Sequence, residues 1–101
     1  MKRTHVDSER WFDVVLENER AQAATMVLEP GESTGGRANA HRESDQWLYV
    51  VSGSGRATVG DLEFPLAADD LLVVEAGETH EFRAADDERL ETLSIYVPPA
   101  Y

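Results

Sequence analysis

Short runs of apolar residues, separated by polar turn residues, recur along most of the chain. Each run is rich in leucine, β-branched or aromatic residues, and glycine, aspartate or serine stands between neighbouring runs. Many short strands at close, regular spacing are typical of a sandwich or barrel, so we expect an all-β chain. The predicted strands after residue 45 are 46–52, 56–59, 62–66, 71–75, 80–83 and 90–97.

The chain before residue 30 is open to two interpretations. Phe12–Glu17 and Ala21–Leu28 are apolar-rich segments joined by the polar residues 18–20, which indicates a β-hairpin. A helix from Ser8 to Leu28 competes, because serine can cap a helix and alanine, glutamate and arginine favour one. The β-branched and aromatic residues gather on both sides of a polar break, so the hairpin is favoured.

Alternation along residues 46–52 predicts which side chains face the interior. Successive side chains of a strand point to opposite faces, so if Gln46 points inward, Trp47, Tyr49 and Val51 point outward. The outward set is apolar, and a sheet that is apolar on both faces is usually covered on both. Either the N-terminal hairpin or a second subunit could cover it.

Length and cysteine content limit the architecture. The chain has 101 residues, enough for one core, so we predict a single domain over residues 1–101. It has no cysteine, which excludes disulfides and thiolate sites. No apolar run reaches membrane-spanning length, and the first residues are not followed by the apolar stretch of a signal peptide. A cytoplasmic location is the expectation.

The charge balance is strongly acidic. The net charge is −11, from 20 acidic and 9 basic residues, which argues against nucleic acid and anionic membranes as partners. Lys2 is the single lysine among those basic residues. An acidic, lysine-poor protein fits either a salt-adapted cytoplasm or a genome of high GC content, and the sequence leaves both open.

Four side chains form a candidate metal site. Asn39 and His41 lie two residues apart, so on a strand they point to one face. Gln46 and His80 each open a predicted strand. Nitrogen and oxygen donors brought together in a barrel could hold one metal ion. Two of these four side chains are neutral amides, which makes the set unusual.

The spacing of these residues resembles that of the cupin superfamily of small jelly-roll barrels. The first cupin motif, at about residues 31–53, has His-x-His, then Glu after three or four residues, then Gly after six more. Here Asn39-x-His41, Gln46 and Gly53 stand at that spacing. Ser33 replaces the opening glycine of the motif.

The second cupin motif corresponds to about residues 69–84. It has Gly, then Pro-x-Gly after five residues, then His after two and Asn after three. In this chain Asp69, Glu75-x-Gly77, His80 and Ala84 stand at these positions. The spacing is kept, while several side chains differ. The resemblance implies an all-β, cupin-type double-stranded β-helix, that is, a jelly-roll barrel.

The resemblance also implies a ligand set for a divalent metal ion. Typical metal cupins use three histidines and one glutamate, whereas Asn39, His41, Gln46 and His80 carry no formal charge. Some small sugar-acting cupins are similar to this chain in having glutamine at the position of Gln46. We therefore expect a weakly held divalent ion, one of Fe, Mn, Ni or Zn. The alternative is a metal-free pocket in which the same four side chains bind one another or water.

Three functions remain compatible with this pattern. The chain could be a metal-dependent enzyme with dioxygenase-, isomerase- or hydrolase-like chemistry on a small oxygen-rich compound. It could be a non-catalytic cupin that binds a small, sugar-like ligand. It could also be a metal-free isomerase in which His41 or His80 is the general base. Whether it is an enzyme stays open. Small cupins commonly form dimers, so the resemblance implies a homodimer.

Several other residues have more ordinary expected roles. Trp11 is expected to pack in the core or at an interface rather than at a pocket rim. Tyr96 and Tyr101 flank Pro98-Pro99. They could line a ligand pocket or an interface, but surface packing is favoured. Asp45 precedes Gln46, so its side chain should face away from the site.

Overall fold

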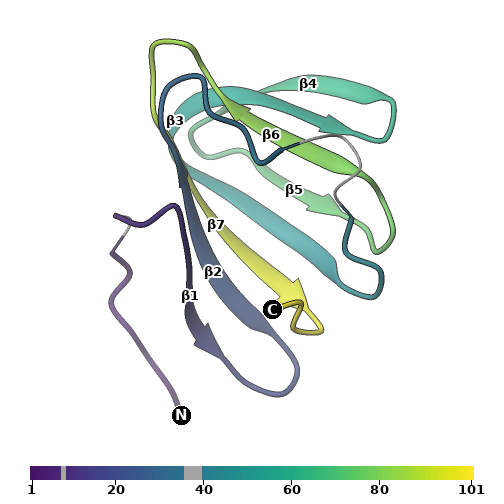
Figure 1. Cartoon of the computed structure of the whole chain (residues 1–101). Coiled ribbons are helices and arrows are strands. Elements are labelled where there is room, and N and C mark those ends of the chain that lie inside the picture. Colours follow the sequence, from purple (N-terminus) through teal and green to yellow (C-terminus); the bar gives the residue numbers. More distant parts are fainter. Residues whose placement is uncertain (8, 36–39) are drawn as a thin grey trace.

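The computed structural model describes residues 1–7, 9–35 and 40–101, and all the regular structure in these ranges is strand (Figure 1). The all-β prediction is therefore confirmed, and the alternative helix over residues 8–28 is wrong. No helix in the described ranges is long and apolar enough to cross a bilayer. The strands are β1 (Phe12–Glu17), β2 (Gln22–Leu28), β3 (Asp45–Val59), β4 (Leu62–Ala67), β5 (Leu71–Val74), β6 (His80–Ala84) and β7 (Leu90–Val97).

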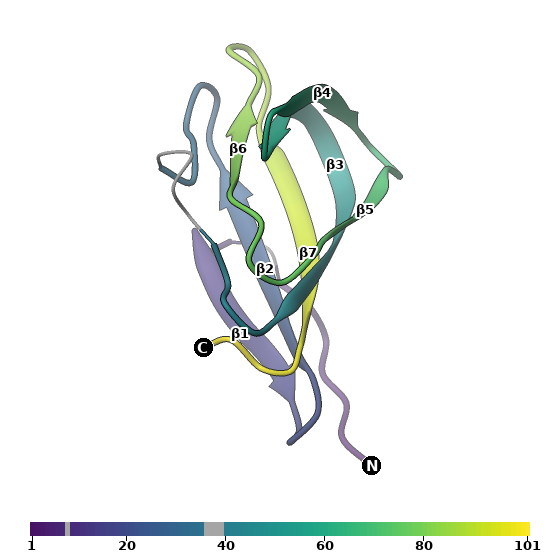
Figure 2. The same cartoon turned by 90° about the vertical axis from the view of Figure 1, so that its right-hand side faces the viewer.

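The strands form two curved antiparallel sheets that share β3. The first half of β3 pairs with β5 on one side and β7 on the other, and β2 and β1 extend this sheet beyond β7. The second half of β3 runs between β4 and β6. Figure 2 shows β1, β2, β7 and β3 side by side in one layer, with β6 lying across from them. The interior between the sheets closes at one end and opens at the other.

The segment Gly53-Ser54-Gly55, predicted to be a turn, lies inside β3 and only bends it. Gly53 has a positive φ of 88°, and a Cβ there would lie 1.8 Å from the carbonyl oxygen of Arg89. A Cβ at Gly55 would lie 2.1 Å from the carbonyl oxygen of Arg83. These glycines therefore allow neighbouring backbone segments to approach closely. A glycine in this role and a glycine in a turn look the same in the sequence.

The predicted alternation of the 46–52 segment is confirmed. Gln46 is 3% exposed and Leu48 and Val50 are fully buried, whereas Trp47 is 46% exposed. The register of β3 against β7 shifts after Val50. Beyond this bulge the buried positions become odd-numbered, as at Ala57. The bulge thus lets one strand present an inward face to both sheets.

The interior beyond the site is packed with apolar side chains. Phe82 of β6 and Met26 of β2 belong to this core and also line the cavity described below. They therefore form a floor between the core and the cavity. The most deeply buried core members include Leu28, Leu48, Val50, Phe82 and Leu90.

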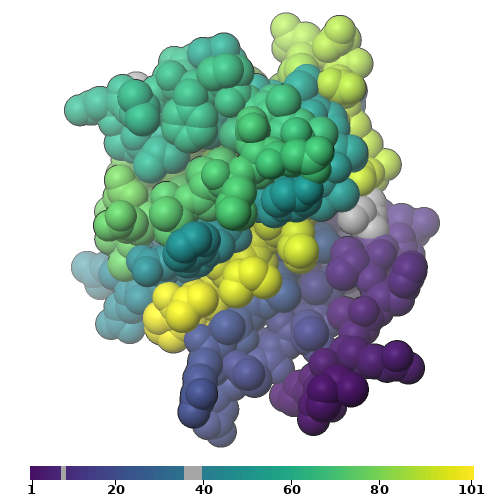
Figure 3. All heavy atoms as spheres, turned by 180° about the vertical axis from the view of Figure 1, so that it is seen from behind, coloured from purple at the N-terminus to yellow at the C-terminus, as the bar shows by residue number. Residues whose placement is uncertain are grey.

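The β1–β2 hairpin extends the sheet at its edge and does not cover the outer face of β3. The strand order β1-β2-β7-β3 therefore excludes the hairpin as the element that covers this face and leaves a second subunit as the alternative. The N-terminal segment packs against the hairpin instead, where Lys2 Nζ donates to the carbonyl oxygen of Glu17 at 2.9 Å (Figure 3, purple). Trp47, Tyr49 and Val51 consequently remain exposed.

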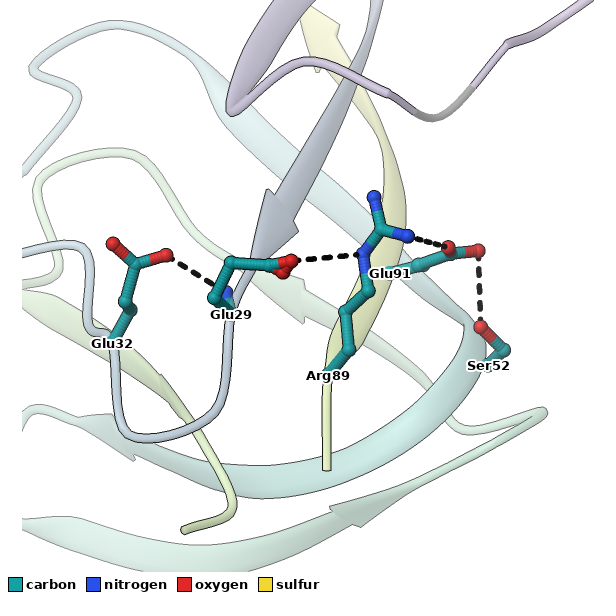
Figure 4. Close-up of polar contacts among 5 residues, drawn as sticks. All are labelled: Glu29, Glu32, Ser52, Arg89 and Glu91. Atoms are coloured by element: carbon teal, nitrogen blue, oxygen red, sulfur yellow. Dashed lines mark hydrogen bonds and ion pairs between the residues drawn. The ribbon is translucent and has the colours of Figure 1, made fainter. Parts of the chain in front are cut away.

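A polar network links the end of β2, the start of β7 and the bulge in the middle of β3 (Figure 4). Arg89 pairs with Glu29 at 3.6 Å and with Glu91 at 3.4 Å, and Ser52 Oγ donates to Glu91 at 3.0 Å. The Glu29 amide donates to Glu32 Oε1 at 2.8 Å. Exposed ion pairs contribute only about 0–1 kcal/mol each. The network therefore aligns these segments, while the buried core supplies most of the stability.

Candidate functional site

Three of the four predicted site residues line one cavity at the open end of the barrel. His41 lies in the loop before β3, Gln46 near the start of β3 and His80 at the start of β6. The ring centroids of His41 and His80 are 5.1 Å apart. The cavity has a volume of about 380 Å³. Asn39, the fourth predicted residue, lies outside the described residues.

Backbone contacts hold the two histidine-bearing loops together. The Gly77 amide donates to the carbonyl oxygen of His41 at 2.7 Å. The Ala76 amide donates to Asp45 Oδ1 at 2.9 Å. Asp45 thus binds the turn between β5 and β6 rather than the cavity, in line with its expected orientation. The loop that precedes His80 is in this way attached to the segment that carries His41.

Gln46 has one satisfied and one unsatisfied amide atom. Its Nε2 donates to Ser94 Oγ at 3.1 Å. Its Oε1 is buried and accepts no hydrogen bond from the described residues. A buried acceptor without a donor costs about 1–3 kcal/mol, so this oxygen favours a bound donor or a cation.

His80 is held in a defined orientation. It is 5% exposed, and its Nδ1 lies 3.3 Å from the carbonyl oxygen of Glu78. A neutral imidazole that donates from Nδ1 to a carbonyl keeps a lone pair on Nε2. Burial lowers the pKa of His80, and the Glu78 carbonyl opposes this effect in part. His80 is therefore neutral at pH 7.

His41 has a similar electrostatic environment. Burial lowers its pKa, and the neighbouring His80 lowers it further. Its Nε2 lies 3.5 Å from the hydroxyl oxygen of Tyr101. Both imidazoles are therefore uncharged near pH 7 and can offer a lone pair to a metal ion or a proton.

Aromatic side chains form a wall of the cavity that sequence reasoning missed. Tyr96 was expected at the surface but is only 3% exposed and lines the cavity, whereas Tyr101 is 63% exposed at the surface and lines the cavity as well. Phe12 and Trp11 line it too. Alternation along β7 gave no signal for Tyr96, because the outward odd-numbered positions, with Leu93 and Ile95, are as apolar as the inward ones. Its inward position follows from its pairing with Gln46. Tyr101 lies beyond the last strand, where no alternation applies.

The described lining of the cavity contains no Asp, Glu, Lys or Arg side chain. Nowhere in the described ranges do three or more His, Cys, Asp or Glu side chains gather closely enough to hold a metal ion. The available donors are two imidazoles and one amide oxygen, a neutral set. Such a set accepts a divalent ion with less charge compensation than a set that includes a carboxylate.

Comparisons with known proteins agree with this architecture. A family model described as the cupin domain matches residues 24–96. A Bacillus halodurans protein superposes with a TM-score of 0.84 at 25% identity, covering 90% of this chain and 72% of the other. No curated protein matches the chain in sequence. The predicted cupin-type barrel is thus confirmed.

Two further structures superpose on this chain. KdgF from Halomonas sp. has a TM-score of 0.78 at 19% identity, over 87% of this chain and 77% of that protein. A Thermotoga maritima protein described as a predicted oxalate decarboxylase has a TM-score of 0.77 at 24% identity, over 87% and 79%. At these identities the likeness extends to the fold alone.

Proposed function

This chain belongs to the cupin family, and from that premise we propose that it binds a small oxygen-bearing molecule in the barrel cavity, together with a weakly held divalent ion. The fold hosts many activities, so the site must carry the proposal. The observation that carries it is the buried Oε1 of Gln46, which accepts no hydrogen bond from the part of the chain that the structure describes and belongs to a residue that shares a cavity with His41 and His80. The single-domain organisation and the cytoplasmic location remain predictions from the sequence.

The residues present fit a divalent ion that is held weakly. His41, His80 and Gln46 would supply two imidazole nitrogens and one amide oxygen, which suit Fe, Mn, Ni or Zn. Asn39, outside the described residues, stays the fourth donor predicted from the sequence. A bound ion would polarise a ligand oxygen as a Lewis acid. The protein's own contribution is to keep both imidazoles neutral and the amide in place.

The absence of a carboxylate among the described lining residues favours a second candidate, a metal-free pocket for the same class of ligand. In that pocket Gln46 Oε1 would accept a hydrogen bond from a ligand hydroxyl, and a neutral histidine would accept or donate another. The metal-bound pocket and the metal-free pocket are each compatible with catalysis and with simple ligand binding. A metal titration distinguishes the two pockets.

The experiment is a calorimetric titration of Mn²⁺ and Zn²⁺ into protein purified without affinity metal. We expect weak, exchangeable binding that His80→Ala abolishes while the barrel stays folded. Gln46→Glu should raise the affinity at least about tenfold, because it adds a negative charge to a neutral set. Binding should weaken below about pH 6, since a protonated imidazole has no lone pair to donate.

His5 provides a matched control, because it lies in the exposed N-terminal segment. His5→Ala should leave the titration unchanged. Chelation should not unfold the protein, since the apolar core does not include the donors. Gln46→Glu with unchanged affinity would contradict the metal site and favour the metal-free pocket.

We also propose that the protein forms a homodimer through the outer face of β3 and β5. The exposed apolar residues Trp47 and Tyr49 pair with Val73 and Leu71 of β5, so they form one continuous patch. No described segment of the chain covers this patch. Between two molecules of the same strong negative charge, an uncharged apolar face is the surface best suited to contact.

A further inference from the structure

The cavity lining combines polar and aromatic side chains. His41, Gln46 and His80 supply polar groups, and the rings of Tyr96 and Tyr101 adjoin them, with centroids 5.0 Å and 5.5 Å from that of His41. Tyr101 is central to the aromatic wall, with its ring centroid 4.8 Å from that of Phe12 and 5.1 Å from that of Tyr96. A ligand that fills the cavity therefore meets flat aromatic surface directly beside hydrogen-bonding groups.

A buried side chain holds the segment that carries Tyr101. Gln22, which is 1% exposed, accepts hydrogen bonds at Oε1 from the amides of Ala100 at 3.1 Å and Tyr101 at 2.9 Å. Its Nε2 donates to the carbonyl oxygen of Tyr101 at 2.6 Å. Three hydrogen bonds from one buried amide fix this backbone. The Tyr101 ring is thus a positioned part of the wall.

Charge limits what can enter the metal-free cavity. None of the described lining residues is a lysine or arginine that could pair with a carboxylate or phosphate. Burying an unpaired charge is costly, and the net charge of −11 adds long-range repulsion of anions. Without a metal ion the cavity therefore favours an uncharged occupant.

The volume of the cavity also limits which ligands can enter. A cavity of about 380 Å³ lies at the small end of the range for ligand pockets, about 300–1,000 Å³. It suits one ring with a few substituents. Aromatic walls bind either another aromatic ring or the flat C–H face of a sugar ring.

We propose that the ligand is an uncharged single-ring compound that packs a flat face against Tyr101 and Phe12 and directs its oxygens toward His41, Gln46 and His80. This inference rests on the proposed function and narrows its ligand class. It assigns Tyr101 as a specificity-determining residue. The pocket would recognise the same two features in an aromatic ring and in a sugar ring, namely a flat ring face and oxygen substituents.

The test is a chemical-shift titration of the isotope-labelled protein, metal-free and with Zn²⁺, against four probes. Phenol and methyl glucoside are the uncharged aromatic and sugar rings, and benzoate and glucuronate are their charged counterparts. In the metal-free protein we expect one uncharged ring to bind at least about tenfold tighter than its charged counterpart. The shifts should centre on Phe12, Tyr101 and the two histidines. The ring type that binds, aromatic or sugar, identifies the chemical class of the ligand.

Variants at Tyr101 separate its ring from its hydroxyl. Tyr101→Ala should weaken binding of the preferred ring about three- to tenfold, and Tyr101→Phe should retain it. Both should fold, because the side chain is largely exposed and lies beyond the last strand. Leu62→Ala, at the exposed start of β4 and outside both the cavity and the apolar patch, is the control and should leave binding unchanged.

Three results in the metal-free protein would overturn the inference: tighter binding of a charged probe, unchanged affinity in Tyr101→Ala, or no binding of either uncharged ring. Each can occur while the metal titration behaves as proposed, and the proposed function then survives with another ligand class. Failure of the metal titration together with no response to any probe would instead overturn the proposed function itself.

Discussion

Single residues determine how closely the backbone segments of this barrel approach. Gly53 and Gly77 both match the cupin motifs, and both have a positive φ, of 88° and 86°. Only Gly53 has a neighbouring backbone where a Cβ would stand; around Gly77 there is nothing within 4 Å. Asp69 stands where the motif has glycine and also has a positive φ, of 76°. Aspartate tolerates this region better than most residues, which explains why the substitution is compatible with the fold.

Gly53→Ala should destabilise the protein by about 3 kcal/mol or more, whereas Gly77→Ala should cost only about 1 kcal/mol. Both substitutions place an alanine at a positive φ, so the difference isolates the clash with the carbonyl oxygen of Arg89, 1.8 Å from a Cβ at Gly53. Urea unfolding followed by tryptophan fluorescence measures both values. An equal loss of unfolding free energy in the two variants would show that the backbone beside Gly53 moves readily to make room for a Cβ.

At the scale of elements, β3 holds the barrel together. It pairs with β4, β5, β6 and β7, whereas β1 pairs with β2 alone. The continuity of β3 through its bulge joins the two sheets, so opening β3 requires opening both. The β1–β2 hairpin lies at the sheet edge, so its separation breaks fewer strand pairings than the opening of β3.

Hydrogen exchange should reveal this hierarchy. The amide of Leu48, which lies between β5 and β7, should exchange only through global unfolding, and the amides of β1 should exchange through local opening that is cheaper by several kcal/mol. Native-state exchange at increasing urea concentration measures both. The control is Leu93 in β7, which pairs with both β2 and β3 and should follow Leu48. A common exchange free energy for β1 and β3 would show that the hairpin is an integral part of the cooperative unit.

At the scale of the whole molecule, an uncovered apolar patch contrasts with a strongly acidic composition. Trp47, Tyr49, Val51, Leu71 and Val73 lie exposed on the outer face of β3 and β5. A monomer that exposes such a patch is prone to association, and the proposed homodimer buries it.

Sedimentation equilibrium at micromolar concentration should show a species of twice the 11.2 kDa monomer mass. Trp47→Glu should convert it to monomer, because a buried charge without a partner at the centre of an interface is costly. Leu62→Glu is the control, since Leu62 is more exposed than Trp47 but begins β4, away from the patch. A monomer at all concentrations, or dissociation by both variants, would reject this interface.

The sequence by itself determined most of the strands and the inward positions of the first half of β3. These features follow from a period of two along each strand, which is a local property of the chain. The boundaries of β1 and β7 and the outward face at Trp47 were predictable for the same reason. The meeting of His41, Gln46 and His80 was implied by the resemblance to the cupin motifs.

Only the tertiary structure decided the aromatic wall, the edge position of the hairpin and the continuity of β3. Gln22 and Tyr101 bind each other across 79 positions of sequence, and no local pattern encodes such a contact. Gly53 could equally have served a turn or a close approach, and the choice depended on the backbone of Arg89 arriving beside it. Local preference decides which way a side chain points. The packing of distant segments decides what that side chain meets, and therefore the composition of the pocket.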